Sequence, residues 1–205
     1  MSIETWLAFA AASAVLLVIP GPTILLVISY ALGRGMRTAL PVALGVALGD
    51  FTAMTLSLLG LGALLATSAL MFTIFKWIGA AYLVWLGIAL WRAGGRLNVE
   101  ARDDRAPALQ MLGHAWLVTA LNPKSITFFV AFLPQFLDPA VGFWQQLIIF
   151  EATFLGLAFA NAIGYGLIAS RARRLVENEQ AIGIFNRVGG GLLIGAGLAA
   201  ASVRQ

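Results

Sequence analysis

Residues 16–27, LLVIPGPTILLV, place two prolines and a glycine in the middle of a long apolar run. Proline removes a backbone donor and clashes with the preceding turn, so an unbroken helix through Pro20, Gly21 and Pro22 is unfavourable. A second apolar run, residues 119–130 with the sequence TALNPKSITFFV, carries a similar break at Asn122-Pro123-Lys124. The sequence therefore predicts two broken helices.

The composition places these runs in a membrane. The chain has 205 residues, of which 60% are hydrophobic and 11% are charged, and its mean hydropathy is +0.91. A soluble domain is about half apolar and about a quarter charged. We therefore expect an all-α integral membrane protein whose apolar surface faces lipid. The absence of cysteine excludes disulfides, thiol chemistry and iron-sulfur or zinc-thiolate sites.

Six apolar stretches are each long enough for the roughly 20 residues that a spanning helix needs. They cover residues 5–31, 39–66, 71–91, 112–136, 143–169 and 182–202. The first stretch follows Glu4 and has no cationic segment before it, so we expect an uncleaved span rather than a secretory signal. The chain is thus a single membrane domain, 1–205, with one hydrophilic linker at about 92–110.

Loop arginines predict the orientation of the spans. The loops after spans one, three and five hold nine arginines, whereas the loops after spans two and four hold no Lys or Arg. The positive-inside rule places the arginine-rich loops in the cytoplasm and both chain ends outside. The arginines are therefore topology signals, and the sequence gives no reason to expect a nucleic-acid partner. They are Arg34, Arg37, Arg92, Arg96, Arg102, Arg105, Arg171, Arg173 and Arg174.

The two halves of the chain resemble each other. Pro22 and Asp50 recur 101 positions later as Pro123 and Glu151, and the third spans match through their glycines and alanines. Because each half has three spans, we expect two inverted repeats, at about 1–91 and about 111–205, as in many secondary transporters. The alternatives are that apolar sequences align easily, and that the repeats form a channel.

Three ionisable residues lie deep within the expected spans: Asp50, Lys124 and Glu151. A charge at the bilayer centre costs from about 2.5 to more than 10 kcal/mol, so each should face the protein interior with a partner. Lys124 could pair with either acid or meet a substrate carboxylate, and an acid could hold an ammonium group or carry a proton. The alternative is a static ion pair that fixes helix packing. Glu151 lies nearer a span end and could reach water.

Two breaks at equivalent places predict a substrate site between the halves, with Pro22 and Pro123 facing each other near mid-membrane. The alternative for each break is a packing kink. Asp50 and Glu151 are the candidate proton carriers, and we favour Asp50 because it lies deeper. The expected substrate-binding residues are Pro20, Gly21, Pro22, Thr23, Asp50, Asn122, Pro123 and Lys124.

Other signals are weaker. Gly45, Gly49 and the run 189–191 predict close helix packing, within one chain or across a homodimer. His114 is the single histidine, and we expect it at the interface rather than on a metal. The chain carries no nucleotide-binding loop, hydrolase nucleophile elbow or zinc-protease pair, so no enzyme activity, cofactor or metal is expected. Active transport would then draw on an ion gradient.

The chain resembles the LysE/RhtB family of amino-acid exporters over nearly its whole length. The resemblance rests on Pro20-Gly21-Pro22, Gly33 to Gly35, Gly45 to Asp50, Lys76 to Leu83 with Trp85 to Gly87, Asn122-Pro123-Lys124 and Phe132 to Phe136.

The resemblance implies a bacterial inner-membrane exporter of amino acids or close derivatives, without cofactor, that works by proton antiport. Members often carry Asp or Asn directly after the Pro-Gly-Pro motif, whereas this chain has Thr23, so its substrate could differ. Alternatives are a metal-cation exporter of the same superfamily, for which the chain is poor in ligands, and a membrane channel or enzyme.

Single cysteines introduced at Ser2, Leu97 and Ser202 test the orientation. An impermeant maleimide applied to intact cells should label positions 2 and 202 and leave position 97 unlabelled, because the loop arginines hold that loop in the cytoplasm. Labelling of position 97 together with protection of the other two would overturn the orientation.

Overall fold

A computed structural model of the chain describes residues 1–67, 106–138, 141–171 and 179–202, and single positions of the expected third span. Every regular element in the described residues is helical. About half of the expected third span, residues 93–105 of the linker, and Arg173 and Arg174 lie outside the described residues. The single positions are 74, 77, 78, 81, 84, 85, 87–89, 91 and 92.

The first expected span consists of two helices. Helix α1 (Ile3–Val18) ends where Ile19 adopts an extended backbone, and α2 (Pro22–Arg34) begins with a proline after an extended Gly21. Proline suits the first position of a helix because the N–H that it lacks would have no partner there. The break predicted at the Pro-Gly-Pro sequence is confirmed. Helix α2 ends at Gly35, whose φ of +67° favours glycine.

The fourth expected span is broken in the same way. Helix α5 (Ala108–Ala120) is followed by α6 (Pro123–Ala131) and the short helix η2 (Leu133–Phe136), and the two parts are bent by 46°. Pro123 opens α6 as Pro22 opens α2. The second predicted break is therefore also confirmed.

The remaining described helices are long and unbroken. After η1 (Gly35–Thr38) come α3 (Ala39–Thr67), α7 (Phe143–Arg171) and α9 (Glu179–Ser202), which correspond to the second, fifth and sixth expected spans. Within the described residues, the helical stretches Pro22–Gly60 and Phe143–Arg171 are long and apolar enough to cross a membrane. The bent pair α5 and α6 makes a third such stretch, and α1 is a shorter apolar helix.

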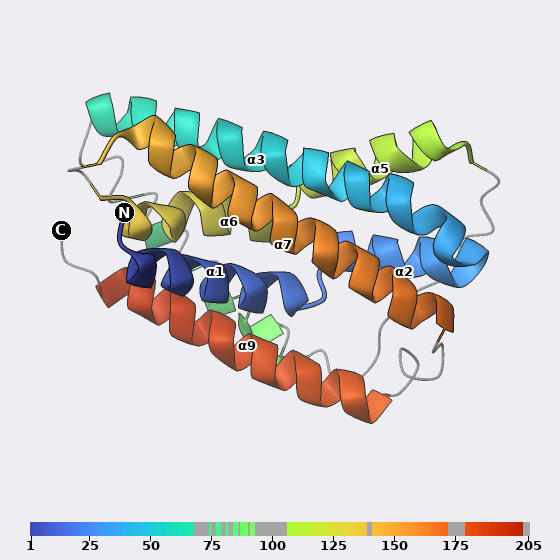
Figure 1. The fold of residues 1–205 in the computed structure, drawn as a ribbon. Helices are drawn as coiled ribbons and strands as arrows, with labels where there is room; N and C mark the ends of the chain where they lie inside the picture. Colours follow the sequence, from blue (N-terminus) through green and yellow to red (C-terminus); the bar gives the residue numbers. More distant parts are fainter. Residues whose placement is uncertain are drawn as a thin grey trace.

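The helices run in two opposite directions. Figure 1 shows α1, α2 and α7 running one way and α3, α5 and α9 running the other. Close contacts agree, since Gly45 of α3 lies against Ala115 of α5 and Gly49 lies against Thr119. Residue numbers increase in the same direction along the two helices from the first contact to the second, so α3 and α5 are parallel. The predicted close packing at these two glycines occurs within one chain.

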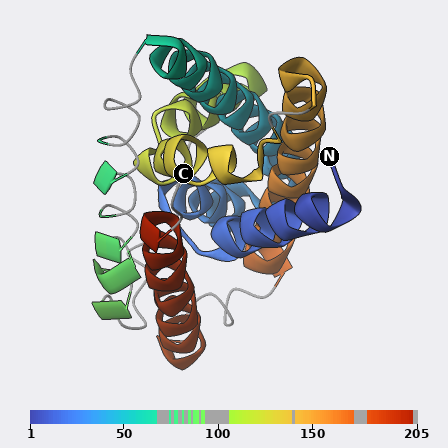
Figure 2. The same ribbon diagram turned by 90° about the vertical axis from the view of Figure 1, so that its left-hand side faces the viewer.

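Helix α9 lies at the edge of the bundle, beside α1 (Figure 2). A Cβ added to Gly190 would lie only 2.5 Å from the carbonyl oxygen of Gly87 and 3.0 Å from the backbone nitrogen of Trp91. The glycine run in α9 therefore also serves close packing inside the chain. The side chains of Trp91, Trp85 and Trp77 are about half exposed, which suits a surface in contact with lipid.

Three of the described loop arginines lie at one end of the bundle. Arg34 ends α2, Arg37 lies in η1 and Arg171 ends α7, and these helix ends lie together in Figure 1. The Arg34 guanidinium donates to the carbonyl oxygen of Ala106, within the expected linker, at 3.1 Å. The starts of α1 and α7 and the end of α9 lie at the other end.

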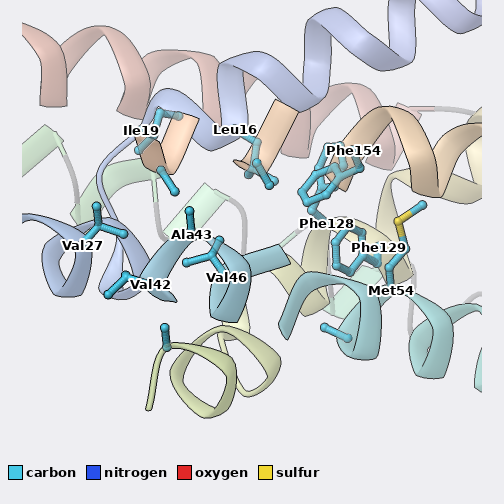
Figure 3. Packing of buried hydrophobic residues seen from close by; sticks show 14 of the residues in the cluster. Leu16, Ile19, Val27, Val42, Ala43, Val46, Met54, Phe128, Phe129 and Phe154 are labelled. Atoms are coloured by element: carbon cyan, nitrogen blue, oxygen red, sulfur yellow. The ribbon is translucent and has the colours of Figure 1, made fainter. Parts of the chain in front are cut away.

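The core between the helices is aromatic at one end and aliphatic toward the breaks (Figure 3). Phe9 of α1 lies 4.5 Å from Phe150 of α7, and Phe129 of α6 lies 4.8 Å from Phe154 of α7, measured between ring centroids. Ring packing fixes α1, α6 and α7 against one another, so the two breaks are held at a defined separation.

Gly49→Ala should destabilise the protein, because the new Cβ would lie 2.6 Å from the Cβ of Thr119 and 2.7 Å from the carbonyl oxygen of Trp116. Overpacking of this kind costs about 1–3 kcal/mol, so the melting temperature in detergent should fall. Gly60→Ala is the matched control on the same helix, because a Cβ there meets no described atom within 4 Å. Equal melting temperatures for the two variants would contradict the packing.

Candidate functional site

The broken end of α1 is held by a lysine from the other half of the chain. The ammonium group of Lys124 donates to the carbonyl oxygen of Leu16 at 2.9 Å and to that of Ile19 at 2.7 Å. These carbonyls lack helical partners because the helix stops at Val18. Lys124 is 6% exposed, so its charge is almost fully withdrawn from the surface. The lysine therefore satisfies two carbonyls that the break releases.

The two carbonyls between them are held by neutral side chains of α7. The amide of Asn161 donates to the carbonyl oxygen of Leu17 at 3.0 Å, and the hydroxyl of Tyr165 donates to that of Val18 at 2.6 Å. Asn161 and Tyr165 are four residues apart and so lie on one face of α7. All four consecutive carbonyls at the end of α1 thus accept a side-chain hydrogen bond.

The two breaks contact each other directly. The side-chain oxygen of Asn122 caps α6 by accepting from the backbone N–H of Lys124 at 3.0 Å, and its amide donates to the hydroxyl of Thr23 at 3.0 Å. That hydroxyl also lies 3.2 Å from the hydroxyl of Thr119 at the end of α5. Asn122, Thr23 and Thr119 are all buried, so a polar connection joins the two halves inside the protein.

Asp50 lies beside this connection. Its side chain is 2% exposed. The carboxyl group interacts with the hydroxyl of Ser125 on α6 and electrostatically with the ammonium group of Lys124. Its Oδ1 atom is buried and has no hydrogen-bond partner among the residues that the structure describes. Because a buried carboxylate oxygen without a donor is costly, this atom marks a place that can accept one.

Glu151 has a different environment although it occupies the equivalent position in the second half. It is half-buried and accepts a hydrogen bond from the hydroxyl of Thr55 on α3. This bond joins α7 to α3, and Glu151 lies ten residues before Asn161, the first residue of α7 that bonds to the broken end of α1. Of the three ionisable residues singled out from the sequence, the structure brings Asp50 and Lys124 together and leaves Glu151 apart.

The prolines of the two break motifs differ in their exposure to the surface. Pro20 is buried, and Gly21 leaves room for the lysine, because a Cβ at that position would lie 3.3 Å from the Lys124 Nζ atom. The rings of Pro22 and Pro123 are exposed. The prolines therefore set the breaks, while the contact between the breaks is made by the residues beside them.

Sequence reasoning missed four polar residues of this site: Thr119, Ser125, Asn161 and Tyr165. The signal for Asn161 and Tyr165 is their spacing, since two polar side chains four apart in an apolar span share one helix face. Ser125 follows the lysine directly and reads as an ordinary helix residue. The expected interfacial His114 is half-buried, and its Nδ1 atom lies 3.0 Å from the hydroxyl of Tyr30.

Three features give the site its binding chemistry. An ammonium has three N–H groups, and Lys124 uses two of them on the carbonyls of Leu16 and Ile19. The start of α2 at Gly21 has no side-chain cap, so its amide groups can receive an anion. Asp50 offers an unpaired oxygen. Donors and an acceptor thus lie within one buried region, as a small zwitterion requires.

These features define a helical membrane protein with a buried polar site between two broken helices. The family model of the LysE type translocators matches residues 14–203. The chain therefore belongs to the LysE family, which consists of transporters.

Similar proteins from bacteria agree with this family. A homoserine/homoserine lactone efflux protein of Salmonella typhimurium is 32% identical over 205 residues, with all of both chains covered. An "Uncharacterized membrane protein" of Vibrio cholerae is 35% identical over 204 residues, again across both whole chains. A leucine efflux protein of Enterobacter sp. is 35% identical over 124 residues, 60% of this chain and 59% of the relative. No solved structure matches the chain.

Thr23→Val should destabilise the connection between the breaks. It removes the acceptor for the buried Asn122 amide at nearly constant side-chain volume. A buried donor left without a partner costs about 1–3 kcal/mol. The melting temperature in detergent should fall further than for Thr127→Val, the same change at a half-buried position of α6. A smaller effect at position 23 than at position 127 would contradict the role of this connection.

Proposed function

We propose that the protein is a secondary active exporter of amino acids or closely related small zwitterions, that it lies in the bacterial inner membrane, and that it works by proton antiport. The observation that carries the proposal is the buried polar region at the meeting of α1, α2, α5 and α6. There, with respect to the described part of the chain, Lys124 keeps one N–H group and Asp50 keeps one oxygen without a hydrogen-bond partner. A zwitterion away from water needs both kinds of partner.

The names of the relatives support the substrate class. Homoserine, its lactone and leucine share an amino group, but the lactone has no free carboxylate. The group common to all three is therefore the ammonium, for which Asp50 is the proposed acceptor. The substrate carboxylate, where present, would meet Lys124 and the uncapped start of α2 at Gly21. The exported compound is thus expected to be a neutral amino acid or a derivative that keeps its amino group.

An inverted-repeat architecture with six spans fits the contacts between the halves. Trp6 of α1 donates to the hydroxyl of Thr153 on α7 at 2.9 Å, and Trp116 of α5 donates to that of Thr52 on α3 at 3.1 Å. Thr52 and Thr153 each follow the acid of their half by two residues. The first broken helix of each half therefore contacts the same position in the other half, which supports repeats at about 1–91 and 111–205.

The proposed orientation has the arginine end of the bundle in the cytoplasm. Arg34, Arg37 and Arg171 lie at that end, and the first helix begins at the other. The proposal therefore puts both chain ends outside.

A homodimer would use surfaces other than the glycine contacts. Single glycines already pack α3 against α5 and α9 against the described part of the third span within one chain.

Proton coupling is assigned to Asp50. A neutral Asp50 can no longer hold the substrate ammonium, so protonation from the outside would release the substrate there. Return of the proton to the cytoplasm would restore the carboxylate for the next substrate. Glu151 has a partner in Thr55 and lies away from the breaks, so its role in coupling is secondary.

Asp50→Asn should remain in the membrane yet abolish export driven by a proton gradient, because the amide cannot exchange a proton. Glu151→Gln should reduce export only mildly, since the amide oxygen still accepts from Thr55. Both variants are compared with the unaltered chain in proteoliposomes, using homoserine and leucine inside and a pH gradient across the membrane.

Substrate counterflow in the same vesicles separates binding from coupling. Asp50→Asn should lose gradient-driven export, and any exchange that it keeps should need a higher substrate concentration, because its neutral amide holds the substrate ammonium less tightly than the carboxylate does. Export by this variant at the unaltered rate and with the same pH dependence would eliminate Asp50 as the proton carrier. Absence of counterflow with every amino acid tested would remove the proposed function itself.

A further inference from the structure

The position of the Lys124 ammonium has the form of a cation site. Its Nζ atom lies 2.9 Å from one backbone carbonyl oxygen and 2.7 Å from another, those of Leu16 and Ile19. Both oxygens belong to the C-terminal end of a half-helix, where the helix dipole is negative. Unwound carbonyls and half-helix C-termini coordinate the coupling cations of other transporters built from broken helices.

The groups around the Lys124 ammonium favour one positive charge at this position. Asp50, buried on α3, interacts electrostatically with the ammonium group and also interacts with Ser125 of α6. The remaining carbonyls of the same helix end, those of Leu17 and Val18, are occupied by uncharged donors of Asn161 and Tyr165. One cation therefore balances one carboxylate, and the carbonyls of Leu16, Leu17, Val18 and Ile19 all have donors already.

The chain also makes space for this ammonium. Gly21 stands at the point where a side chain would press against it, since an added Cβ would lie 3.3 Å from Nζ and 3.5 Å from the two carbons before it. Lys124 belongs to α6, which lies in the second half of the chain, whereas α1 lies in the first half. Its side chain therefore reaches across the interface between the two broken helices and places its charge at the end of α1.

We infer that Lys124 is a tethered cation, which fills a monovalent-cation site that the broken end of α1 would otherwise offer to a free ion such as Na⁺ or a small ammonium. The unaltered protein therefore needs no alkali ion, and removal of the lysine amine opens the site. The inference rests on the proposed function for its consequence in transport, whereas its binding test measures no transport.

The test compares Lys124→Ala with Tyr165→Phe in purified detergent-solubilised protein. Thermal unfolding is followed in choline chloride, in sodium chloride and in methylammonium chloride at equal ionic strength. At a cation concentration about ten times the Kd, a cation that binds the vacated site should raise the melting temperature of Lys124→Ala by about 3–6 °C. Sodium or methylammonium, or both, should have this effect relative to choline.

Tyr165→Phe is the matched control. It removes a donor from the same helix end, at the carbonyl of Val18, but the donor is uncharged and its loss leaves the lysine in place. Its melting temperature should respond to the three salts as the unaltered protein does. Equal responses of all three proteins, or no response of Lys124→Ala to either cation, would overturn the inference.

A second measurement does not depend on whether Lys124→Ala folds. Export by the unaltered protein in proteoliposomes should be the same when all sodium is replaced by choline, because the tethered ammonium already fills the site. Export that requires sodium would overturn the inference while leaving the exporter function intact. Absence of export in both salts would instead count against the proposed function and leave the melting result to decide the cation site.

Discussion

The structure depends on the need to satisfy backbone carbonyls where a helix stops inside an apolar environment. The Pro-Gly-Pro sequence ends α1 at Val18, and lipid offers no donor for the carbonyls that the break releases. Lys124, Asn161 and Tyr165 supply those donors from α6 and α7. A break encoded in the first half of the chain therefore requires polar side chains in the second half, and this requirement holds the two halves together.

The glycine contacts and the aromatic core make these bonds possible. Gly45 and Gly49 let α3 approach the backbone of α5, which brings Asp50 to the start of α6. The rings of Phe9 and Phe150 fix α1 against α7, which brings the face of Asn161 and Tyr165 to the end of α1. Close packing away from the polar site thus sets the distances within it.

The sequence predicted the breaks and the residues around them, but it did not predict the partners. Proline chemistry acts locally, so Pro22 and Pro123 mark the helix starts correctly. The partner of Lys124 depends on which groups of a distant helix come within reach, and the residue types alone favoured an acid or a substrate. Equivalent spacing also suggested similar roles for Asp50 and Glu151, yet Thr55 lies opposite Glu151 and gives it a separate bond.

Charge balance connects this arrangement to the proposed transport cycle. Lys124 and Asp50 together carry no net charge, and a zwitterionic substrate adds none, so the occupied site leaves no uncompensated charge in the bilayer. Thr23 keeps this balance, because an acid at that position would add a negative charge beside Asn122. Protonation of Asp50 would leave two positive charges, those of the lysine and the substrate ammonium, against one substrate carboxylate, and so a net charge of +1 in one buried region. That state repels the ammonium, so in the proposed cycle the proton expels the substrate through electrostatics.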